Sequence, residues 1–276
     1  MDVMVKEAQK DDLKPIPESL FYALKDSKGK IIGVVAVDNY FKEQPIPEEQ
    51  VAKLQRFADQ AAIAIENATL YANLKKAYLD AIRMLAFAVD AKDHYTLGHS
   101  DKVGSIAKSI AREMGLDPAQ VEEIEYGAIL HDVGKIAISE KILNKPGRLT
   151  DEEYVLMKKH TVMGVNIMEH TEAIANLMPI VRHHHEWYNG KGYPDGLKGE
   201  AIPMGARIVA LADAFDTMVS DRPYRKVLGI PAAISEIKRF SGTQFDPKVV
   251  EALLNLLKRH ENIYDQSTFL MESSIG

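Results

Sequence analysis

The first apolar pattern along the chain lies between residues 20 and 38, where the sequence reads LFYALKDSKGKIIGVVAVD. Two runs rich in β-branched and aromatic residues flank a polar segment from Lys25 to Lys30. Short apolar runs separated by a polar turn are typical of an antiparallel β-hairpin. The pattern therefore predicts two paired strands near the N-terminus.

A long helix is predicted after the hairpin. Pro47 is followed by two glutamates, which is helix-start chemistry, and no further proline occurs before Pro118. Between Val51 and Val89, positions taken in alternating steps of three and four residues are all apolar except Lys75. A period near 3.5 is typical of a bundle helix or of a coiled coil. We expect either an ordinary bundle helix or a homodimer formed along residues 51–89.

From about Tyr78 onward the apolar pattern is mainly helical. Its interruptions lie at residues 115–118, 146–147, 188–205 and 229–231, all of which contain Gly or Pro. No strand-like alternation recurs in this part of the chain. For the last two hundred or so residues the pattern therefore predicts an all-α domain with one long loop rich in glycine and proline.

The composition of the chain limits its expected partners and the residue types that can bind a metal. The chain has 34 Lys and Arg against 40 Asp and Glu, a net charge of -6, so nucleic-acid polymers and anionic membranes are not expected partners. It has no cysteine, so a metal must be bound by His, Asp and Glu. The first residues, MDVMVKEAQKDD, lack the apolar region of a signal peptide, and no apolar run approaches the roughly eighteen residues of a membrane span. We expect a cytoplasmic protein of enzyme size.

The strongest candidate for chemistry is His131 with Asp132, at the end of an apolar helical run. Burial of such a pair is costly unless both groups find partners. Neighbouring residues on a helix point about 100° apart, so the two side chains can address two adjacent metal ions. Lys135, one turn after His131, is expected to point to the same side.

Further imidazoles and carboxylates are spread along the chain. They are His99, His160, the pair His184 and His185, and the pair Asp213 and Asp216 at a spacing that shares one helix face. Each alone has an ordinary explanation as a capping, surface or structural residue, and His94, His170, His183 and His260 keep that explanation. A combined set without sulfur suits iron, manganese, nickel or zinc.

These segments carry a family resemblance. The chain from about Leu79 to Leu254 resembles the HD-GYP family, the metal-dependent phosphodiesterase branch of the HD superfamily. The matching segments are residues 93–100 (DHYTLGHS), 131–135 (HDVGK), 142–147 (ILNKPG), 157–160 (MKKH), 184–186 (HHE), 192–197 (GYPDGL), 213–216 (DAFD) and 221–226 (DRPYRK). The resemblance implies a mainly α fold, the HD-superfamily helical bundle.

The resemblance also implies an activity: hydrolysis of the bacterial messenger cyclic di-GMP to pGpG or GMP at a dinuclear centre, commonly of iron, with manganese as the alternative. The positions that match the two-metal ligand set are His131, Asp132, His160, His184, His185 and Asp213, with Asp132 bridging. His99 matches a further position, which binds a third metal in some members. Those members carry Glu where this chain has Tyr95, so we expect two ions.

Two adjacent cations provide a metal-bridged hydroxide at neutral pH and neutralise charge on the phosphate. We therefore expect Asp132, Lys135 and Asp216 to act in catalysis, with Lys135 on a phosphate oxygen and Asp216 orienting the water or a ligand histidine. Arginine offers a planar fork to phosphate or guanine. The expected substrate-binding residues are Lys135, Gly192, Tyr193, Pro194, Asp216, Arg222 and Arg225.

The hairpin and the start of the long helix resemble the final third of a GAF sensory domain. The strands and helices that would complete its pocket are then missing from residues 1–50, so we expect no working small-molecule sensor in this chain. The expected organisation is a truncated GAF-like segment at residues 1–75, containing the hairpin and part of the connecting helix. An HD-GYP phosphodiesterase domain at residues 76–276 follows it.

Two alternatives to cyclic di-GMP hydrolysis stay open. One is hydrolysis of another cyclic dinucleotide or of a mononucleotide, which side-by-side turnover of the candidate substrates separates. The other is a dimeric signalling module that binds cyclic di-GMP without cleaving it. Loss of a ligand position would favour this second alternative, and the sequence retains every matched ligand.

Overall fold

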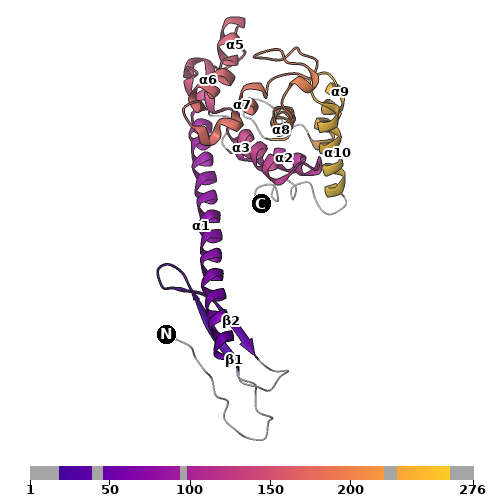
Figure 1. Ribbon diagram of the computed structural model, residues 1–276. Helices are drawn as coiled ribbons and strands as arrows, with labels where there is room; N and C mark the ends of the chain where they lie inside the picture. Colours follow the sequence, from indigo (N-terminus) through magenta and orange to yellow (C-terminus); the bar gives the residue numbers. More distant parts are fainter. Residues whose placement is uncertain (1–18, 39–45, 94–97, 221–228, 262–276) are drawn as a thin grey trace. The chain divides into compact units, whose positions relative to one another are not determined.

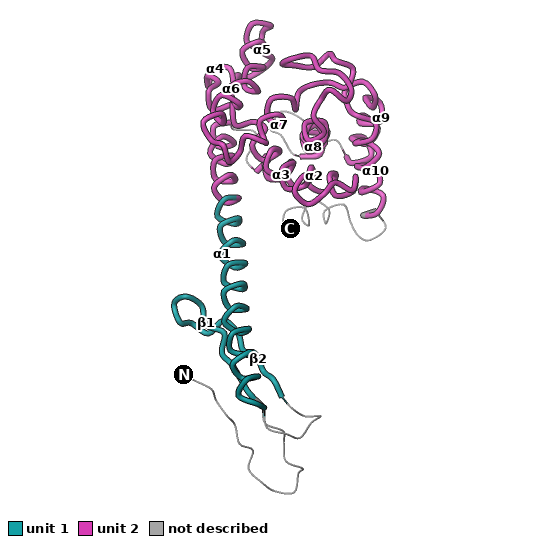
Figure 2. The backbone as a smooth tube through the Cα atoms, in the orientation of Figure 1, with its two compact units in different colours: residues 1–78 teal, residues 79–276 magenta. Residues whose placement is uncertain are grey.

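The computed structural model describes residues 19–38, 46–93, 98–220 and 229–261. The chain forms two compact units, residues 1–78 and residues 79–276, and the division falls within helix α1 (Glu48–Lys92) (Figure 2). Each unit is described by itself. None of the helices in the described ranges is long and apolar enough to span a membrane.

The first unit contains the predicted hairpin, which is confirmed. Strand β1 (Ser19–Lys25) pairs antiparallel with β2 (Ile31–Asp38). Asp26 Oδ1 closes the turn by accepting hydrogen bonds from the backbone N–H groups of Lys28 and Lys30, and Gly29 supplies the positive φ of 80° that the turn requires. Leu24 of this hairpin packs on two small residues of α1, Ala58 and Ala62.

The predicted long helix is α1, which confirms the helix start at the two glutamates after Pro47. Along the apolar stripe, Ala58 is buried near the start of the helix, and Ile82, Ala86 and Val89 are buried near its end. Between them Ile65 is 44% exposed. The middle of the stripe is therefore uncovered in the single chain over its described residues.

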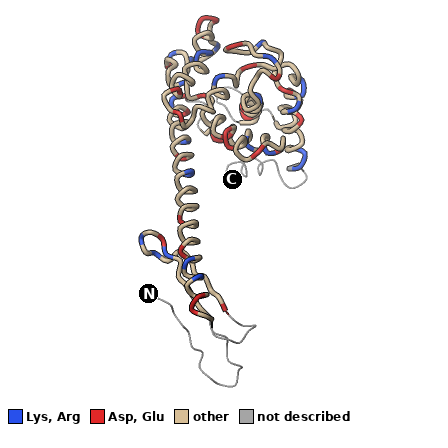
Figure 3. Tube along the Cα trace, in the orientation of Figure 1, with Lys and Arg blue, Asp and Glu red and all other residues tan. Residues whose placement is uncertain are grey.

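The second unit is all-α in its described residues, as predicted. Its helices, in chain order (Figure 1), are α2 (His99–Glu113), α3 (Pro118–Ile129), η1 (Val133–Ala137), α4 (Glu140–Leu143), α5 (Asp151–Lys158), α6 (His160–Met168), η2 (Glu172–Leu177), α7 (Met178–His183), η3 (Gly199–Ala201), α8 (Met204–Val219), α9 (Ile230–Phe240) and α10 (Pro247–Glu261). The long loop predicted at residues 188–205 separates α7 from α8. Acidic and basic residues are interspersed over this unit (Figure 3).

The core lies between α2, α3, α8 and α10. Ile106, Phe215 and Leu253 are fully buried there, each from a different helix. On the other side of the unit, η1 packs directly on the start of α6. A Cβ at Gly134 would lie 1.9 Å from the carbonyl oxygen of His160. Only glycine allows this approach, which brings the turn carrying His131 and Asp132 next to His160.

Candidate metal centre

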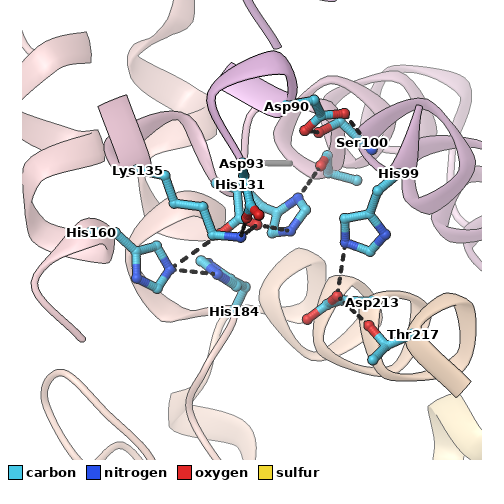
Figure 4. A network of polar contacts seen from close by, with 12 residues as sticks. Asp90, Asp93, His99, Ser100, His131, Lys135, His160, His184, Asp213 and Thr217 are labelled. Atoms are coloured by element: carbon cyan, nitrogen blue, oxygen red, sulfur yellow. Dashed lines mark hydrogen bonds and ion pairs between the residues drawn. The ribbon is translucent and has the colours of Figure 1, made fainter. Parts of the chain in front are cut away.

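All seven residues predicted to bind metal gather in two adjoining groups, and Figure 4 labels five of them, His99, His131, His160, His184 and Asp213. The first group consists of Asp132, His160, His184 and His185, and the second of His99, His131 and Asp213. Within each group the candidate ligand atoms lie within 4.8 Å of one another. The groups meet where the Nε2 atom of His131 is 3.2 Å from Oδ2 of Asp132.

His131 and Asp132 lie just beyond a helix rather than on one, which corrects the sequence interpretation. Helix α3 ends at Ile129. After it the backbone forms hydrogen bonds to the residue three positions earlier, as in a 3₁₀ turn, and Val133 N–H donates to the Leu130 carbonyl. The two residues therefore belong to a turn that leads into η1. Their side chains approach each other rather than diverging as expected, with Nε2 of His131 3.2 Å from Oδ2 of Asp132.

The imidazoles of His131, His160 and His184 are oriented in the same way. The Nδ1 atom of each lies 2.6 to 2.8 Å from the backbone carbonyl oxygen three residues earlier in the chain. A carbonyl accepts only from N–H, so each Nδ1 carries a hydrogen, and Nε2 presents a lone pair when the ring is neutral. Such a carbonyl contact behind the ring is typical of metal-binding histidines.

These Nε2 atoms face one another. Those of His160 and His184 are 3.4 Å apart, and two lone pairs at this distance repel unless a cation or proton lies between them. The Nε2 atom of His131 is buried and forms no hydrogen bond of good geometry among the described residues, although Oδ2 of Asp132 lies 3.2 Å away. Buried polar atoms are almost always satisfied. The donor set therefore fits bound divalent metal.

Burial holds the histidines of the first group in the neutral form that binds metal. It lowers the pKa of His160, and it lowers the pKa of His185 to about 3. Burial together with the neighbouring imidazoles holds the pKa of His184 well below its ordinary value. Removal of water disfavours the charged form of each ring. Near neutral pH these three rings are therefore free to act as ligands.

Asp132 connects the two groups through both of its oxygens. Its Oδ1 atom is 3.4 Å from Nε2 of His160, and its Oδ2 atom is 3.2 Å from Nε2 of His131. Burial favours the neutral acid, but Lys135 and His131 hold the pKa of Asp132 well below its ordinary value. The side chain is therefore an anion with one oxygen toward each group, the arrangement that a bridging carboxylate requires.

His99 lies between two carboxylates of α8. Its Nδ1 atom is 2.6 Å from Oδ2 of Asp216, and its Nε2 atom is 3.1 Å from Oδ1 of Asp213. Although burial favours the neutral ring, the two aspartates raise the pKa of His99 to about 10. Asp216 thus contacts a histidine of the second group, in keeping with the predicted spacing of Asp213 and Asp216 on one helix face.

Lys135 is half-buried between two carboxylates, one of which the sequence analysis left without a role. Its Nζ atom is 2.7 Å from Oδ2 of Asp132 and 2.9 Å from Oδ2 of Asp93. Burial opposes the charge, but the two aspartates raise the pKa of Lys135 above its ordinary value. Asp93 is 42 residues away in sequence, so no local pattern relates the pair.

The residues just before Asp93 fix the end of α1 to the site. The Nζ atom of Lys92 donates to the carbonyl oxygens of Ile136 and Ile138, each at 2.7 Å. Asp90 accepts a 2.9 Å hydrogen bond from Oγ of Ser100 at the start of α2 (Figure 4). The last turn of α1 therefore holds η1 and α2, which carry Lys135 and His99.

The loop predicted to bind substrate folds back on His185, one of the candidate metal ligands. Tyr193 N–H donates to the His185 carbonyl, and the two rings lie 4.8 Å apart between centroids. A Cβ at Gly192 would lie 2.2 Å from the backbone nitrogen of Trp187. Gly192, Tyr193 and Pro194 are thus held beside the first group.

Buried Glu186 fixes the far end of this loop. Its Oε1 atom accepts hydrogen bonds from the backbone N–H groups of Asp195 and Gly196 at 2.7 and 2.9 Å. Sequence reasoning gave Glu186 no role, although it follows directly after the two candidate ligands His184 and His185. His183 lies with Glu186 and Asp195 in a third group of candidate ligand atoms, which shares no residue with the other two groups.

The remaining predicted residues fall into two classes. His170 is exposed, with 84% of its side chain accessible, which agrees with an ordinary surface histidine. Arg222 and Arg225 lie outside the described residues, as do His94 and the side chain of His260. The predicted arginine contribution to substrate binding therefore stays a prediction.

Known proteins with similar sequences are cyclic dinucleotide phosphodiesterases by name. A cyclic di-GMP phosphodiesterase of Thermotoga maritima is 42% identical over 187 residues, which cover 67% of this chain and 51% of the relative. The cyclic di-GMP phosphodiesterase response regulator RpfG of Xanthomonas campestris is 37% identical over 221 residues, 79% of this chain and 58% of the relative. The chain thus spans about half the length of these relatives.

A solved structure has the same fold. A cyclic GMP-AMP specific phosphodiesterase of Vibrio cholerae matches with a TM-score of 0.54 at 21% identity, over 70% of this chain and 52% of the other. The sequence profile described as "HD domain" matches residues 83–249, which include every candidate metal ligand. The match contains the His131 and Asp132 pair and covers more than half of the chain. This chain therefore belongs to the HD domain family.

Proposed function

We propose that this chain hydrolyses cyclic di-GMP to pGpG or GMP in a metal-dependent reaction. The observation that carries the proposal is Asp132, an anion whose two oxygens face two groups of oriented imidazoles. Relatives named as cyclic di-GMP phosphodiesterases support this substrate. The substrate is a bacterial second messenger, so we propose a cytoplasmic location.

We propose two divalent ions, of iron or alternatively of manganese, because all the donors are imidazole nitrogens and carboxylate oxygens. Asp132, His160, His184 and His185 would hold one ion, and His131 and Asp213 would complete the other with Asp132. When bound, such a pair activates water and neutralises phosphate charge. His99 already lies between Asp213 and Asp216, which agrees with two ions rather than three.

Residues around the proposed metal site would supply positive charge to the reacting phosphate and keep the neighbouring side chains oriented. Lys135 places a permanent positive charge beside Asp132, suited to a non-bridging phosphate oxygen. Asp93 restrains this lysine from its other side. Asp216 holds the ring of His99 through Nδ1. The site is thus organised before substrate binds.

The central test combines metal analysis of anaerobically purified protein with product identification from cyclic di-GMP. We expect about two ions per chain and release of pGpG or GMP. Cyclic GMP-AMP and a mononucleotide, assayed side by side, test the alternative substrates. Metal-loaded protein that binds cyclic di-GMP without any turnover would support the non-catalytic signalling module instead.

The expected substrate-binding residues give a prediction about substrate size. We expect Tyr193→Ala and Arg225→Ala to weaken cyclic di-GMP binding while metal occupancy stays at the wild-type level. Hydrolysis of bis(p-nitrophenyl) phosphate should fall much less, because contacts remote from the phosphorus contribute only to a substrate large enough to reach them. Equal losses on both substrates would show that these residues support the metal centre or the fold.

We further propose that residues 1–75 are a partial GAF-like segment and that residues 76–276 form the phosphodiesterase domain. The confirmed hairpin and the packing of Leu24 against Ala58 support a folded N-terminal segment. Dimerisation is proposed through residues 51–89, because the middle of the apolar stripe on α1 is exposed.

The dimer makes a separate prediction. Sedimentation at micromolar concentration should show two chains, and Leu54→Glu with Ile65→Glu should weaken their association. Metal content should stay unchanged in this double variant, because every candidate ligand lies beyond residue 98. A wild-type protein that sediments as a monomer would contradict the interface.

A further inference from the structure

Three side chains form a cluster beside the candidate metal centre. Tyr154 and Lys158 lie one turn apart on α5, and Tyr193 comes from the loop after α7. The Nζ atom of Lys158 is 5.1 Å from the centroid of the Tyr154 ring and 5.8 Å from that of Tyr193. We call these three residues the rim cluster.

The rim cluster is continuous with the metal ligands. The Tyr193 ring lies 4.8 Å from the ring of His185, and α5 leads through Lys159 directly to His160. Burial and the neighbouring Tyr154 raise the pKa of Tyr193, so its phenol is neutral beside the lysine. A ligand phosphate at the metal centre would therefore have the rim cluster as its neighbour.

The cluster offers a cation and an open aromatic face. Tyr154 is 49% exposed, whereas Lys158 is half-buried between the two rings. Within the described ranges, no carboxylate forms an ion pair with Lys158. Aromatic rings hold an ammonium in place without neutralising it. The positive charge of Lys158 is therefore positioned and available to an anion, in a chain whose net charge is -6.

A cyclic dinucleotide presents the complementary chemistry. It has two phosphates and two bases in one ring, so when one phosphate reacts, the other and its base project away from the metals. Lysine binds phosphate as a point charge, and an exposed tyrosine is a stacking surface for a base. A simple phosphate monoester would lack the second phosphate that reaches Lys158.

We propose that the rim cluster binds the non-reacting half of a cyclic dinucleotide, with Lys158 on its second phosphate and Tyr154 stacked on a base. The proposal rests on the proposed function for its substrate class. It adds two binding residues from α5 to the loop residues already expected. It also gives α5 a function, since this helix contributes no side chain to the metal groups.

The test is direct binding by the metal-loaded full chain. The probe is a hydrolysis-resistant phosphorothioate analogue of cyclic di-GMP, measured by titration calorimetry. Lys158→Met should weaken binding about tenfold, the loss of one charge-assisted contact, and should reduce its dependence on salt. Tyr154→Ala should weaken binding by a comparable factor, whereas Tyr154→Phe keeps the ring and should bind nearly as wild type.

Lys159→Met is the matched control, since Lys159 is the exposed next residue and the charge change is identical. It should keep wild-type binding, and all variants should keep wild-type metal content. Equal weakening in Lys158→Met and Lys159→Met would overturn the proposal, as would wild-type binding by Lys158→Met or no binding by the wild type. A wild type that binds the analogue but does not hydrolyse cyclic di-GMP would refute only the proposed function.

Discussion

Asp132→Ala is expected to abolish hydrolysis of cyclic di-GMP and to remove most of the metal. One oxygen of this carboxylate faces His160 and the other faces His131, so both ion positions lose a ligand at once. Two nearby cations would also lose the anion between them, and their mutual repulsion would rise. Metal content and turnover, measured on the same preparation, check this expectation.

Two controls separate loss of metal from loss of fold. Asp101→Ala removes an exposed aspartate of α2 that pairs with Arg83 at 3.0 Å and belongs to none of the groups of candidate ligands. This variant should keep its metal and its turnover. The helical content of metal-free Asp132→Ala should match that of the metal-free wild type, which would show that the variant is folded. Wild-type metal content with normal activity in Asp132→Ala would disprove the bridging assignment.

The elements that sequence predicted well are those with local causes. The hairpin follows from two apolar runs around a turn that Asp26 and Gly29 close within five residues. The long helix α1 follows from a proline-free periodic stretch that begins after Pro47. In both cases the determining contacts lie close together in the chain, so pattern and structure coincide.

The sequence predicted which residues gather at the candidate site, but it did not predict how they are arranged. His131 and Asp132 stand out in sequence, but their geometry depends on where α3 ends and on the close approach of Gly134 to His160. Lys135 stands out as well, whereas its partner Asp93 is fixed by the packing of the end of α1. Such tertiary contacts leave no periodic signal.

The cluster around Lys158 shows the same limit. Tyr154 and Lys158 are one helical turn apart, a spacing that ordinary surface residues share. Only the folded loop brings Tyr193 within 5.8 Å of the lysine. Sequence reasoning therefore predicted a substrate-binding role for the loop and gave no role to Tyr154 and Lys158 on α5.

Lys135→Ala is expected to leave the metal bound and to lower turnover by about 10²- to 10³-fold, the usual cost of one lost contact to the developing phosphate charge. The lysine ammonium contacts Asp132 but is itself no ligand, so the imidazoles and carboxylates of both groups remain in place. Metal analysis and steady-state rates with cyclic di-GMP measure the two effects separately.

A variant of Asp93 tests whether its ion pair with Lys135 contributes to turnover. Asp93→Asn keeps the lysine and its charge but weakens the restraint that the 2.9 Å ion pair provides, so its loss of turnover should be smaller than that of Lys135→Ala. Lys141→Ala, an exposed lysine on α4, should be indistinguishable from wild type. If Lys135→Ala instead loses metal as completely as Asp132→Ala, the lysine serves to hold Asp132 in place, and the phosphate contact must be assigned to another residue.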